Sequence, residues 1–424
     1  MYKHRSMNDV FVFDSYGYSP DTHEAYFTYK IRDYVYTERL AFAPPAGDVN
    51  QVVFDAALRL AFLLVGTSYY KCFPAAKAEL PFVVDEWQAN FLNSVYRDGL
   101  SQFIFENKLD PNTLVYFDAT GESKSAGELG AEGIVCLQSG GKDSLLLASM
   151  LREKGTASTP WYVSSTDVHP SVLDTFETPL RVVKRIIARD ELARAKENGG
   201  LNGHVPVTYI VTSFAIIDAV LHGENTVLLG IGNEGAEAHA YVGDMAVNHQ
   251  WSKTWPAEQM FSEYVRRYIA TDMRVGSPLR SFTELHIAEL FVQHAWGRYG
   301  RSFSSCNVGN YRQGNDNTTL GWCGTCSKCA NSYLLFAPFV DPAELRDVFG
   351  SDLLANPDLV DDFKGLLGID DAMKPFECVG EVDELRAAYR MALTRGYTAL
   401  PLDVPESLFD KDANHPAQPW VNEL

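Results

Sequence analysis

One short stretch of the chain, residues 133–144, constrains the fold more than any other. Residues 133–138 are mostly apolar and predict a buried strand. Residues 145–154 are too long and too apolar for a strand, so they predict a buried helix. Between them lie two glycines, two serines, a lysine and an aspartate. Such a turn points backbone N–H groups and the positive end of a helix at one place, which favours a bound phosphate.

This turn differs from the two common nucleotide-binding loops. A Walker A loop requires glycine where Cys136 stands and serine or threonine where Asp143 stands, and the dinucleotide fingerprint does not match either. The string Ser-Gly-Gly-Lys-Asp-Ser at 139–144 instead resembles the loop of the ATP pyrophosphatases, which have the PP-loop fold and cleave ATP to AMP and pyrophosphate. The structural alternative is a glycine-rich turn in an ordinary αβ crossover.

Strands and helices alternate after this turn. Residues 160–164, 180–183 and 226–230 predict strands separated by helical segments. This alternation predicts an α/β fold with a doubly wound parallel sheet. Residues 231–235 follow a strand as residues 139–144 do, and ligands of such sheets bind at the carboxyl ends of strands. We therefore expect the two loops to face each other across ATP, with Asn233 and Glu234 as further contacts.

The pattern divides the chain into three predicted domains. Alternating aromatic residues up to about residue 45 predict a small antiparallel sheet, and residues 51–69 and 85–106 predict helices. A polar, glycine-rich linker follows at 118–133. We predict an α+β module at 1–125, an ATP-binding α/β domain at 126–300 and a C-terminal cysteine-cluster and helical region at 301–424.

Charge and hydropathy exclude several classes of partner. The chain has 36 basic and 55 acidic residues, a net charge of −19, which argues against a nucleic-acid groove or an anionic membrane surface. We expect no apolar run of membrane-spanning length and see no signal-peptide core, so the predicted location is cytoplasmic. An acidic protein that binds nucleotides needs Mg²⁺, and Asp143 is the expected Mg²⁺ contact.

Three of the seven cysteines form a tight cluster. Cys323, Cys326 and Cys329 are separated by two residues each, a spacing that lets three sulfurs converge on one ion. Structural zinc takes four ligands, and Cys306 is our fourth, with Cys378 in reserve. Packed or redox-active thiols are the alternative, and an iron–sulfur cluster is a further one.

Six strings, read together and in order, resemble one family. They lie at residues 139–144, 202–208, 247–253, 304–307, 322–329 and 374–381. The set is similar to the UDP-N-acetylmuramoyl-L-alanyl-L-glutamate epimerases, called MurL. The 7-cyano-7-deazaguanine synthases also combine a PP-loop with a four-cysteine zinc site, but their chains are much shorter. One departure is visible, because Gly235 stands where the family pattern has a cationic residue.

The resemblance implies a reaction and its participants. The family enzyme converts the terminal L-Glu of UDP-MurNAc-L-Ala-L-Glu to D-Glu during peptidoglycan precursor synthesis, consuming ATP and releasing AMP and diphosphate. The substrate is thus a small molecule rather than nucleic acid or membrane. Residues expected to hold the pyrophosphate are those of the loop: Ser139, Gly140, Gly141, Lys142, Asp143 and Ser144.

Adenylation explains how such an enzyme would remove an α-proton. Transfer of AMP to the α-carboxylate removes its negative charge and makes the α-proton more acidic. An acid/base group must then titrate near neutrality. Our candidates are His249, Cys378, His204 and Lys253. The rival readings are another PP-loop adenylating ligase or nitrile-forming synthase, and a zinc-stabilised binding protein with a degenerate loop.

Overall fold

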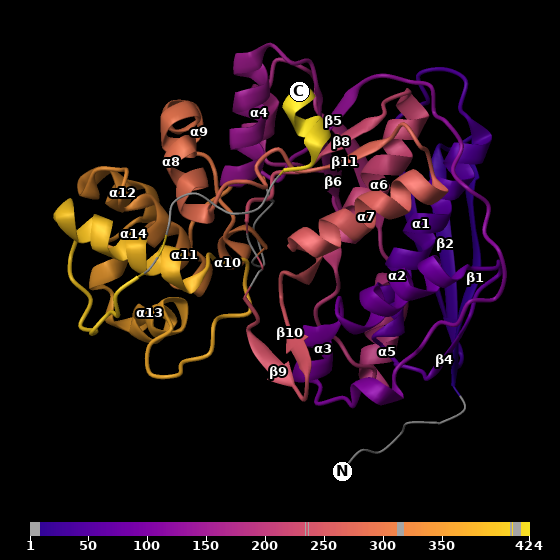
Figure 1. The fold of residues 1–424 in the computed structure, drawn as a ribbon, viewed down its shortest axis with the longest axis horizontal. Coiled ribbons are helices and arrows are strands. Elements are labelled where there is room, and N and C mark those ends of the chain that lie inside the picture. The colour runs from indigo at the N-terminus through magenta and orange to yellow at the C-terminus, as the bar shows by residue number, and fades with distance from the viewer. Residues whose placement is uncertain (1–8, 234, 236, 312–317, 408, 410–416) are drawn as a thin grey trace.

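The structure is a computed structural model that describes the whole chain except residues 1–8, 234, 236, 312–317, 408 and 410–416. Within the described residues, one long sheet has the strand order β11-β8-β5-β6-β7-β3-β2-β1-β4, and β9 and β10 form a separate hairpin (Figure 1). The strands are β1 (Val10–Ser19), β2 (Glu24–Ile31), β3 (Tyr34–Ala41), β4 (Lys77–Glu79), β5 (Ile134–Leu137), β6 (Thr159–Ser164), β7 (Arg181–Ile186), β8 (Thr226–Leu228), β9 (Ala240–Val242), β10 (Met245–Val247) and β11 (Arg274–Gly276).

Five neighbouring strands of the nine in this sheet are parallel to one another. Strands β5, β6, β7, β8 and β11 pair in parallel, and counted along the chain they stand in the order 5-4-1-2-3. The predicted α/β fold with a largely parallel sheet is confirmed. The direction of the connections reverses between β5 and β8, and ligands of open α/β sheets bind beside such a switch point.

The N-terminal strands extend the same sheet. The predicted antiparallel strands form as β1, β2 and β3, but β3 also pairs with β7, so they do not make a sheet of their own. At this junction the guanidinium of Arg185 donates to both carboxylate oxygens of the buried Glu38, at 2.7 and 3.2 Å. The division into three domains stays a prediction, since a sheet that crosses residue 125 neither requires nor forbids it.

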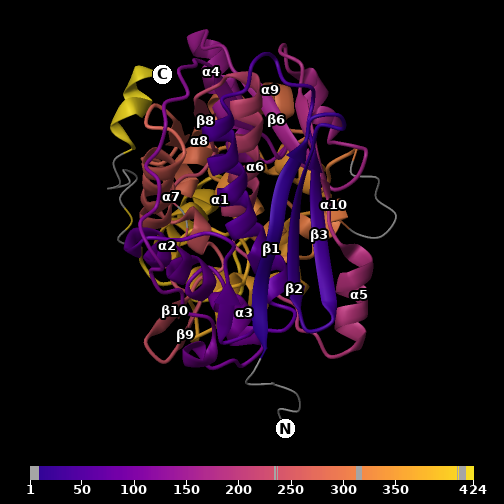
Figure 2. The same ribbon diagram turned by 90° about the vertical axis from the view of Figure 1, so that its right-hand side faces the viewer.

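Helices cover both faces of the sheet. Helices α1 and α6 lie side by side along one face (Figure 2), while α4 and α8 pack together in a second core on the other. The helices of this part of the chain are α1 (Gln51–Tyr70), α2 (Glu86–Arg97), α3 (Ser101–Glu106), α4 (Lys142–Lys154), α5 (Arg189–Glu197), α6 (Val207–His222), α7 (Trp255–Tyr268), α8 (Glu284–His294) and α9 (Trp296–Tyr299).

Helix α1 is an exception to our expectation about membrane-spanning length. Its apolar window has a mean hydropathy of 1.5 and is long enough to cross a bilayer, but 78% of that window is buried inside the protein. A core helix passes the same test as a membrane span, and α1 packs against β1, β2 and α6. We therefore interpret α1 as the central helix of the first core, which is the hydrophobic core on the face of the sheet covered by α1 and α6.

The prediction of one helix at 85–106 is wrong in one respect, because the chain forms two helices there. Helix α2 ends at Arg97, and α3 begins at Ser101. A Cβ atom on Gly99 would lie 2.5 Å from the Val95 carbonyl oxygen and 3.1 Å from the Trp251 ring. The glycine lets Trp251 approach the backbone at the break, and the break lets α3 contact β10.

The C-terminal region is helical, as expected. Its helices are α10 (Asn307–Tyr311), α11 (Ser327–Phe336), α12 (Pro342–Phe349), α13 (Val360–Leu367) and α14 (Val382–Thr394). Helix α11 packs against α8, α13 and α14 and continues the core that holds α4. The buried carboxylate of Glu384 on α14 accepts from the backbone N–H of Leu285, at the start of α8, at 3.0 Å. The C-terminal helices are thereby attached beside the turn between β5 and α4.

Candidate active site and metal centre

The turn at 139–144 lies at the switch point of the sheet. Gly140 has a φ of +79°, a left-handed conformation that favours glycine. A Cβ atom on Gly230, just beyond β8, would lie 2.7 Å from the Asp143 carbonyl carbon and 2.8 Å from the Ser144 nitrogen. The segment after β8 therefore packs directly against the start of α4 at Gly230, and the predicted approach of residues 231–235 across ATP stays a prediction.

Lys142 is buried in this turn between two carboxylates. Its ammonium donates to Asp143 and to Glu284, at the start of α8. Burial by itself lowers the pKa of Lys142, but the two carboxylates together raise it above its ordinary value. The hydroxyls of Ser139 and Ser144 lie 3.3 Å apart on the same turn. The result is an ammonium, held by two carboxylates, and two hydroxyls beside a helix N-terminus, and it is the N-terminus that suits an anion.

Three other predicted residues lie in or near the loop after β8. The backbone N–H of Asn233 donates to the Phe282 carbonyl at 2.8 Å. Lys253 is held by its backbone, since its carbonyl accepts from the buried Arg280 guanidinium, which also bonds the Gly232 carbonyl. Glu234 lies outside the described residues, so its predicted contact with ATP stays a prediction.

Gly235 has a structural reason to be glycine. Its φ is +80°, and a Cβ atom there would lie 3.0 Å from the Gln250 Cβ and 3.1 Å from the Gln250 carbonyl oxygen. The side chain of Asn248 donates to the Gly235 carbonyl at 2.6 Å. A long cationic side chain at this position would require the 248–250 segment to move.

The segment before Cys306 closes over the loop. The backbone N–H of Ser304 donates to the Gly140 carbonyl at 3.2 Å, and Ser305 is in contact range of Gly141. A cavity of about 190 Å³ opens here, at the carboxyl ends of β5 and β6. Its lining residues are Ser139, Tyr162, Pro170, Ser304, Ser305, Asn307, Asn310, Leu320, Lys328 and Cys378. The reserve ligand Cys378 thus lines a cavity with the loop serine.

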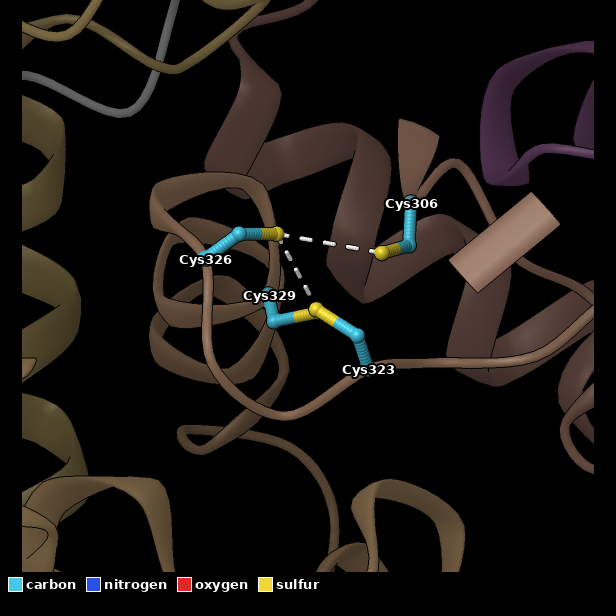
Figure 3. Close-up of side chains that lie close together, drawn as sticks. All are labelled: Cys306, Cys323, Cys326 and Cys329. Atoms are coloured by element: carbon cyan, nitrogen blue, oxygen red, sulfur yellow. Dashed lines mark hydrogen bonds between the residues drawn. The ribbon is translucent and has the colours of Figure 1, made fainter. Parts of the chain in front are cut away.

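Four cysteines converge at one place, and the first of them, Cys306, is two residues beyond Ser304. The sulfurs of Cys306, Cys323, Cys326 and Cys329 all lie within 4.8 Å of one another (Figure 3). Three of the separations are 3.6–3.7 Å. Metal–sulfur bonds of about 2.3 Å in a tetrahedron would separate the sulfurs by about 3.8 Å. The predicted cluster is confirmed as a group that can bind a metal ion, with Cys306 as the fourth member and Cys378 outside it.

A second cluster, which we call the histidine cluster, consists of His204, His239 and His249. The rings of His204 and His249 are 4.4 Å apart, and those of His239 and His249 are 6.2 Å apart. Sequence reasoning missed His239, which stands between alanines in no recognisable motif. The only signal was its position just before the β9–β10 hairpin. There the backbone N–H of His239 donates to the Val247 carbonyl at 2.8 Å. Pairing of that hairpin brings His239 to His249.

Burial keeps two of these rings neutral. Burial, reinforced by the charge of neighbouring groups, lowers the pKa of His204 to about 3 and that of His239 to about 4. The opposite happens nearby, where burial raises the pKa of Glu381 to about 8. Glu381 and Glu237 share the ammonium of Lys374, at 3.2 and 2.7 Å. Strongly perturbed pKa values of this kind cluster at functional sites.

These pKa values predict a loss of stability in mild acid. Unfolded histidine titrates near pH 6.5, so between about pH 6.5 and 4 the unfolded chain binds protons that buried His239 does not. Stability falls as pH falls through this window. We expect His239→Asn to reduce the slope by up to about 1.4 kcal/mol per pH unit, with the largest change between pH 6 and 5. Urea unfolding at pH 7, 6 and 5 measures it, with the exposed His294→Asn as control. An unchanged slope in the His239 variant would contradict the assignment.

One segment, residues 374–381, joins the histidine cluster to the cavity. The ring of Phe376 stacks on His239 with 5.4 Å between centroids, while Cys378, two residues on, lines the cavity with Ser139. The side chain of Gln250, next to His249, reaches the Val379 carbonyl at 3.5 Å. The side chain of the residue after His249 therefore contacts the backbone of the residue after Cys378. The structure brings together the strings at 139–144, 247–253, 304–307 and 374–381.

A larger cavity lies elsewhere and holds none of the predicted site residues. It measures about 590 Å³ and is bounded by β1, the start of α1 and residues such as Tyr18, His23 and Pro45. Size alone would favour it, but a site requires convergent polar groups of altered acidity as well as space. Among the described residues, the large cavity brings together none of the groups with strongly altered pKa values described above.

Comparison with known proteins gives two family matches that together span most of the chain. A model described as the MurL N-terminal domain matches residues 2–277, and one described as the MurL C-terminal domain matches residues 302–400. Three curated relatives each bear the name UDP-N-acetyl-α-D-muramoyl-L-alanyl-L-glutamate epimerase.

These relatives are similar to the chain over most of its length. The protein from Xanthomonas oryzae pv. oryzae (strain MAFF 311018) is 33% identical over 353 residues, which are 82% of this chain and 77% of the relative. The protein from Micromonospora sp. is 32% identical over 389 residues, 89% of this chain and 85% of the relative. The protein from Salinispora tropica is 31% identical over 397 residues, 89% and 83%.

Proposed function

The chain belongs to the MurL family of epimerases, and from this we propose that it inverts the terminal L-glutamate of UDP-MurNAc-L-Ala-L-Glu to D-glutamate, using ATP. The single observation that carries the ATP requirement is the turn at 139–144. Its helix N-terminus, buried ammonium and two hydroxyls lie at the switch point of a doubly wound sheet. We assign this sheet and turn to the PP-loop class. Nothing favours the ligase alternative.

The cavity of about 190 Å³ is smaller than the range of about 300–1,000 Å³ typical of ligand sites, so we assign it the phosphate end of ATP and the reacting carboxylate only. Ser139, Lys142 and Ser144 would hold the pyrophosphate leaving group. Asp143 would contact Mg²⁺, whose charge would offset that of the phosphates in an acidic protein. The Asp143 carboxylate is partly exposed at the turn, so a metal ion can reach it.

Adenylation makes the α-proton removable. The α-carboxylate attacks the α-phosphorus of ATP, pyrophosphate leaves, and the resulting acyl-adenylate no longer carries the charge that opposed carbanion formation. Loss and return of the α-proton on opposite faces then inverts the carbon. Water finally cleaves the adenylate to release the D-epimer and AMP. Each turnover thus consumes one ATP for a change that leaves the composition of the substrate unchanged.

We assign the two proton transfers to Cys378 and His249. Cys378 lines the cavity with the loop serine, and the neighbouring Val379 is bonded to Gln250, next to His249. A thiol and an imidazole both take and return protons near neutral pH. His204 lies against His249 and remains a further candidate. Lys253 has the least support of the four predicted acid/base residues, because the contact described above is a backbone one, from the Arg280 guanidinium to its carbonyl.

We assign zinc to the four-cysteine group, in a structural role. Hydrogen bonds from Cys326 and Cys329 lower the pKa of Cys306, and a cysteine that ligates zinc is a thiolate. Bound zinc would supply a fixed tetrahedral crosslink. The crosslink would hold Ser304 and Ser305 over the loop. We also propose a cytoplasmic location, where this precursor would be made.

Metal removal tests the zinc assignment. We expect about one zinc per chain by elemental analysis, and its loss in Cys326→Ser together with a fall in melting temperature on the order of 5–10 °C. Cys378→Ser is the control, because Cys378 lies outside the cluster and its variant should keep the metal. Full zinc content in Cys326→Ser, or loss of zinc in Cys378→Ser, would contradict this ligand set.

Incubation in D₂O tests the function. With ATP, Mg²⁺ and UDP-MurNAc-L-Ala-L-Glu, the protein should form AMP and pyrophosphate and place deuterium at the glutamate α-carbon of the D-epimer. Mass spectrometry follows the deuterium, and chromatography on a chiral phase separates the epimers. Inversion that proceeds equally well without ATP would contradict adenylation. Incorporation of an added amine would instead indicate a ligase.

A further inference from the structure

One contact joins α3 to the histidine cluster, and two others flank it. The Ser101 hydroxyl accepts from the backbone N–H of Asn248 at 3.1 Å. The Gln102 side-chain oxygen lies 2.6 Å from Nδ1 of His249. The Gln102 side-chain nitrogen donates to the Glu106 carboxylate, one helical turn on, at 2.8 Å. Gln102 is buried, so its amide has a fixed set of partners.

These contacts determine which nitrogen of His249 carries the proton. An ionised carboxylate only accepts hydrogen bonds, so the Glu106 side chain requires the NH₂ group of Gln102. The oxygen of Gln102 therefore faces His249, and a carbonyl oxygen also only accepts. The hydrogen of the neutral ring must then be on Nδ1, which leaves the lone pair on Nε2. The conclusion follows from the order carboxylate, amide, imidazole and not from assigned hydrogen positions.

We infer that Gln102 and Glu106 are positioning residues that hold His249 as a base acting through Nε2, an inference that rests on the proposed function. In the proton transfer, the α-carbon–hydrogen bond breaks, its electron pair stays on the activated substrate as an enolate, and the proton forms a bond to Nε2. The imidazolium keeps its Nδ1–H bond to Gln102, whose carbonyl faces the new positive charge. The Cys378 thiol would donate its proton to the opposite face. The thiolate would then take a proton from solvent, and the imidazolium would release its Nε2 proton to solvent, which restores both groups.

The competing explanation is that α3 merely anchors the hairpin. Ser101 offers a matched control for that explanation, since its hydroxyl also bonds the hairpin but does not touch an imidazole. Anchoring predicts that Ser101→Ala and Gln102→Met have similar effects. A positioning role predicts that only changes at 102 and 106 alter the tautomer and the proton transfer.

The test uses the full chain with ¹⁵N-labelled histidine. Long-range ¹H–¹⁵N correlation spectra give the tautomer of His249, assigned with a His249→Asn spectrum. We expect the Nδ1–H form in the wild type and a mixture in Gln102→Met. D-epimer formation should fall roughly 10- to 100-fold in Gln102→Met, as is common when a hydrogen-bond partner of an active imidazole is removed. Pyrophosphate release should fall far less, and Ser101→Ala should change inversion less than about threefold.

An exchange of the two side chains provides the rescue. In Gln102→Glu/Glu106→Gln the carboxylate at 102 accepts from Nδ1 and the amide at 106 donates to it, so inversion should return to within a few-fold of wild type. The inference is overturned by the Nε2–H form in the wild type, by wild-type inversion in Gln102→Met, or by equal losses in Ser101→Ala. Absence of pyrophosphate release in the wild type would instead refute the proposed function, while the spectra still decide the tautomer.

Discussion

Lys142→Met is expected to lower AMP and pyrophosphate formation by roughly 10²- to 10³-fold, because the ammonium would no longer stabilise the negative charge of the leaving pyrophosphate. Methionine has a similar length and no charge, so it removes the electrostatic contribution while filling most of the space. Coupled detection of pyrophosphate measures the rate directly. Inversion should fall with it, since adenylation precedes proton loss.

The variant needs a control for stability. Lys142 is buried against Asp143 and Glu284, and the Glu284 carboxylate is itself buried. Removing the ammonium takes away the charge that offsets this buried carboxylate, which typically lowers the free energy of unfolding by about 3–5 kcal/mol. Lys142→Met/Glu284→Gln removes both charges and should recover much of this stability while staying inactive. Recovery of pyrophosphate release in the double variant would show that the lysine acts only on folding and would remove it from the proposed mechanism.

Cys378→Ala is expected to lower inversion by roughly 10²- to 10⁴-fold while leaving much of the pyrophosphate release intact, the range typical of a lost acid/base group. The physical reason is that the thiol lines the cavity beside Ser139 but contributes no charge to the phosphate site. The two measurements separate the steps, because pyrophosphate release reports adenylation and D-epimer formation reports inversion. ATP would then be consumed without net inversion.

Cys72→Ala provides the matched control, since Cys72 is a thiol buried in the first core, away from the cavity. It should lose a little stability and keep both activities. Cys378→Ser distinguishes acidity from size, because a hydroxyl is close in volume but is far harder to ionise. Parallel losses of pyrophosphate release and inversion in Cys378→Ala would place the residue in nucleotide binding and contradict the assignment.

Short-range patterns in the sequence determined the local structure of the site. The strand, turn and helix around 139–144 follow from an apolar run, two glycines and a second apolar run, and the structure has β5, the turn and α4 there. The spacing of Cys323, Cys326 and Cys329 likewise predicted a cluster that forms. Such features can be read from sequence because residues a few positions apart meet through backbone geometry alone.

Only the tertiary structure decided how distant segments meet. Lys142 bonds Glu284 across 142 positions, and His249 bonds Gln102 across 147, pairings that no local pattern encodes. Pairing of β3 with β7 joined the N-terminal strands to the parallel sheet, and the β9–β10 hairpin brought His239 to His249. Apolar periodicity predicts which face of each helix or strand is buried, but it does not predict which other element packs against that face. The choice of partner depends on packing of the whole chain, and here that packing brings Glu284 to Lys142 and Gln102 to His249.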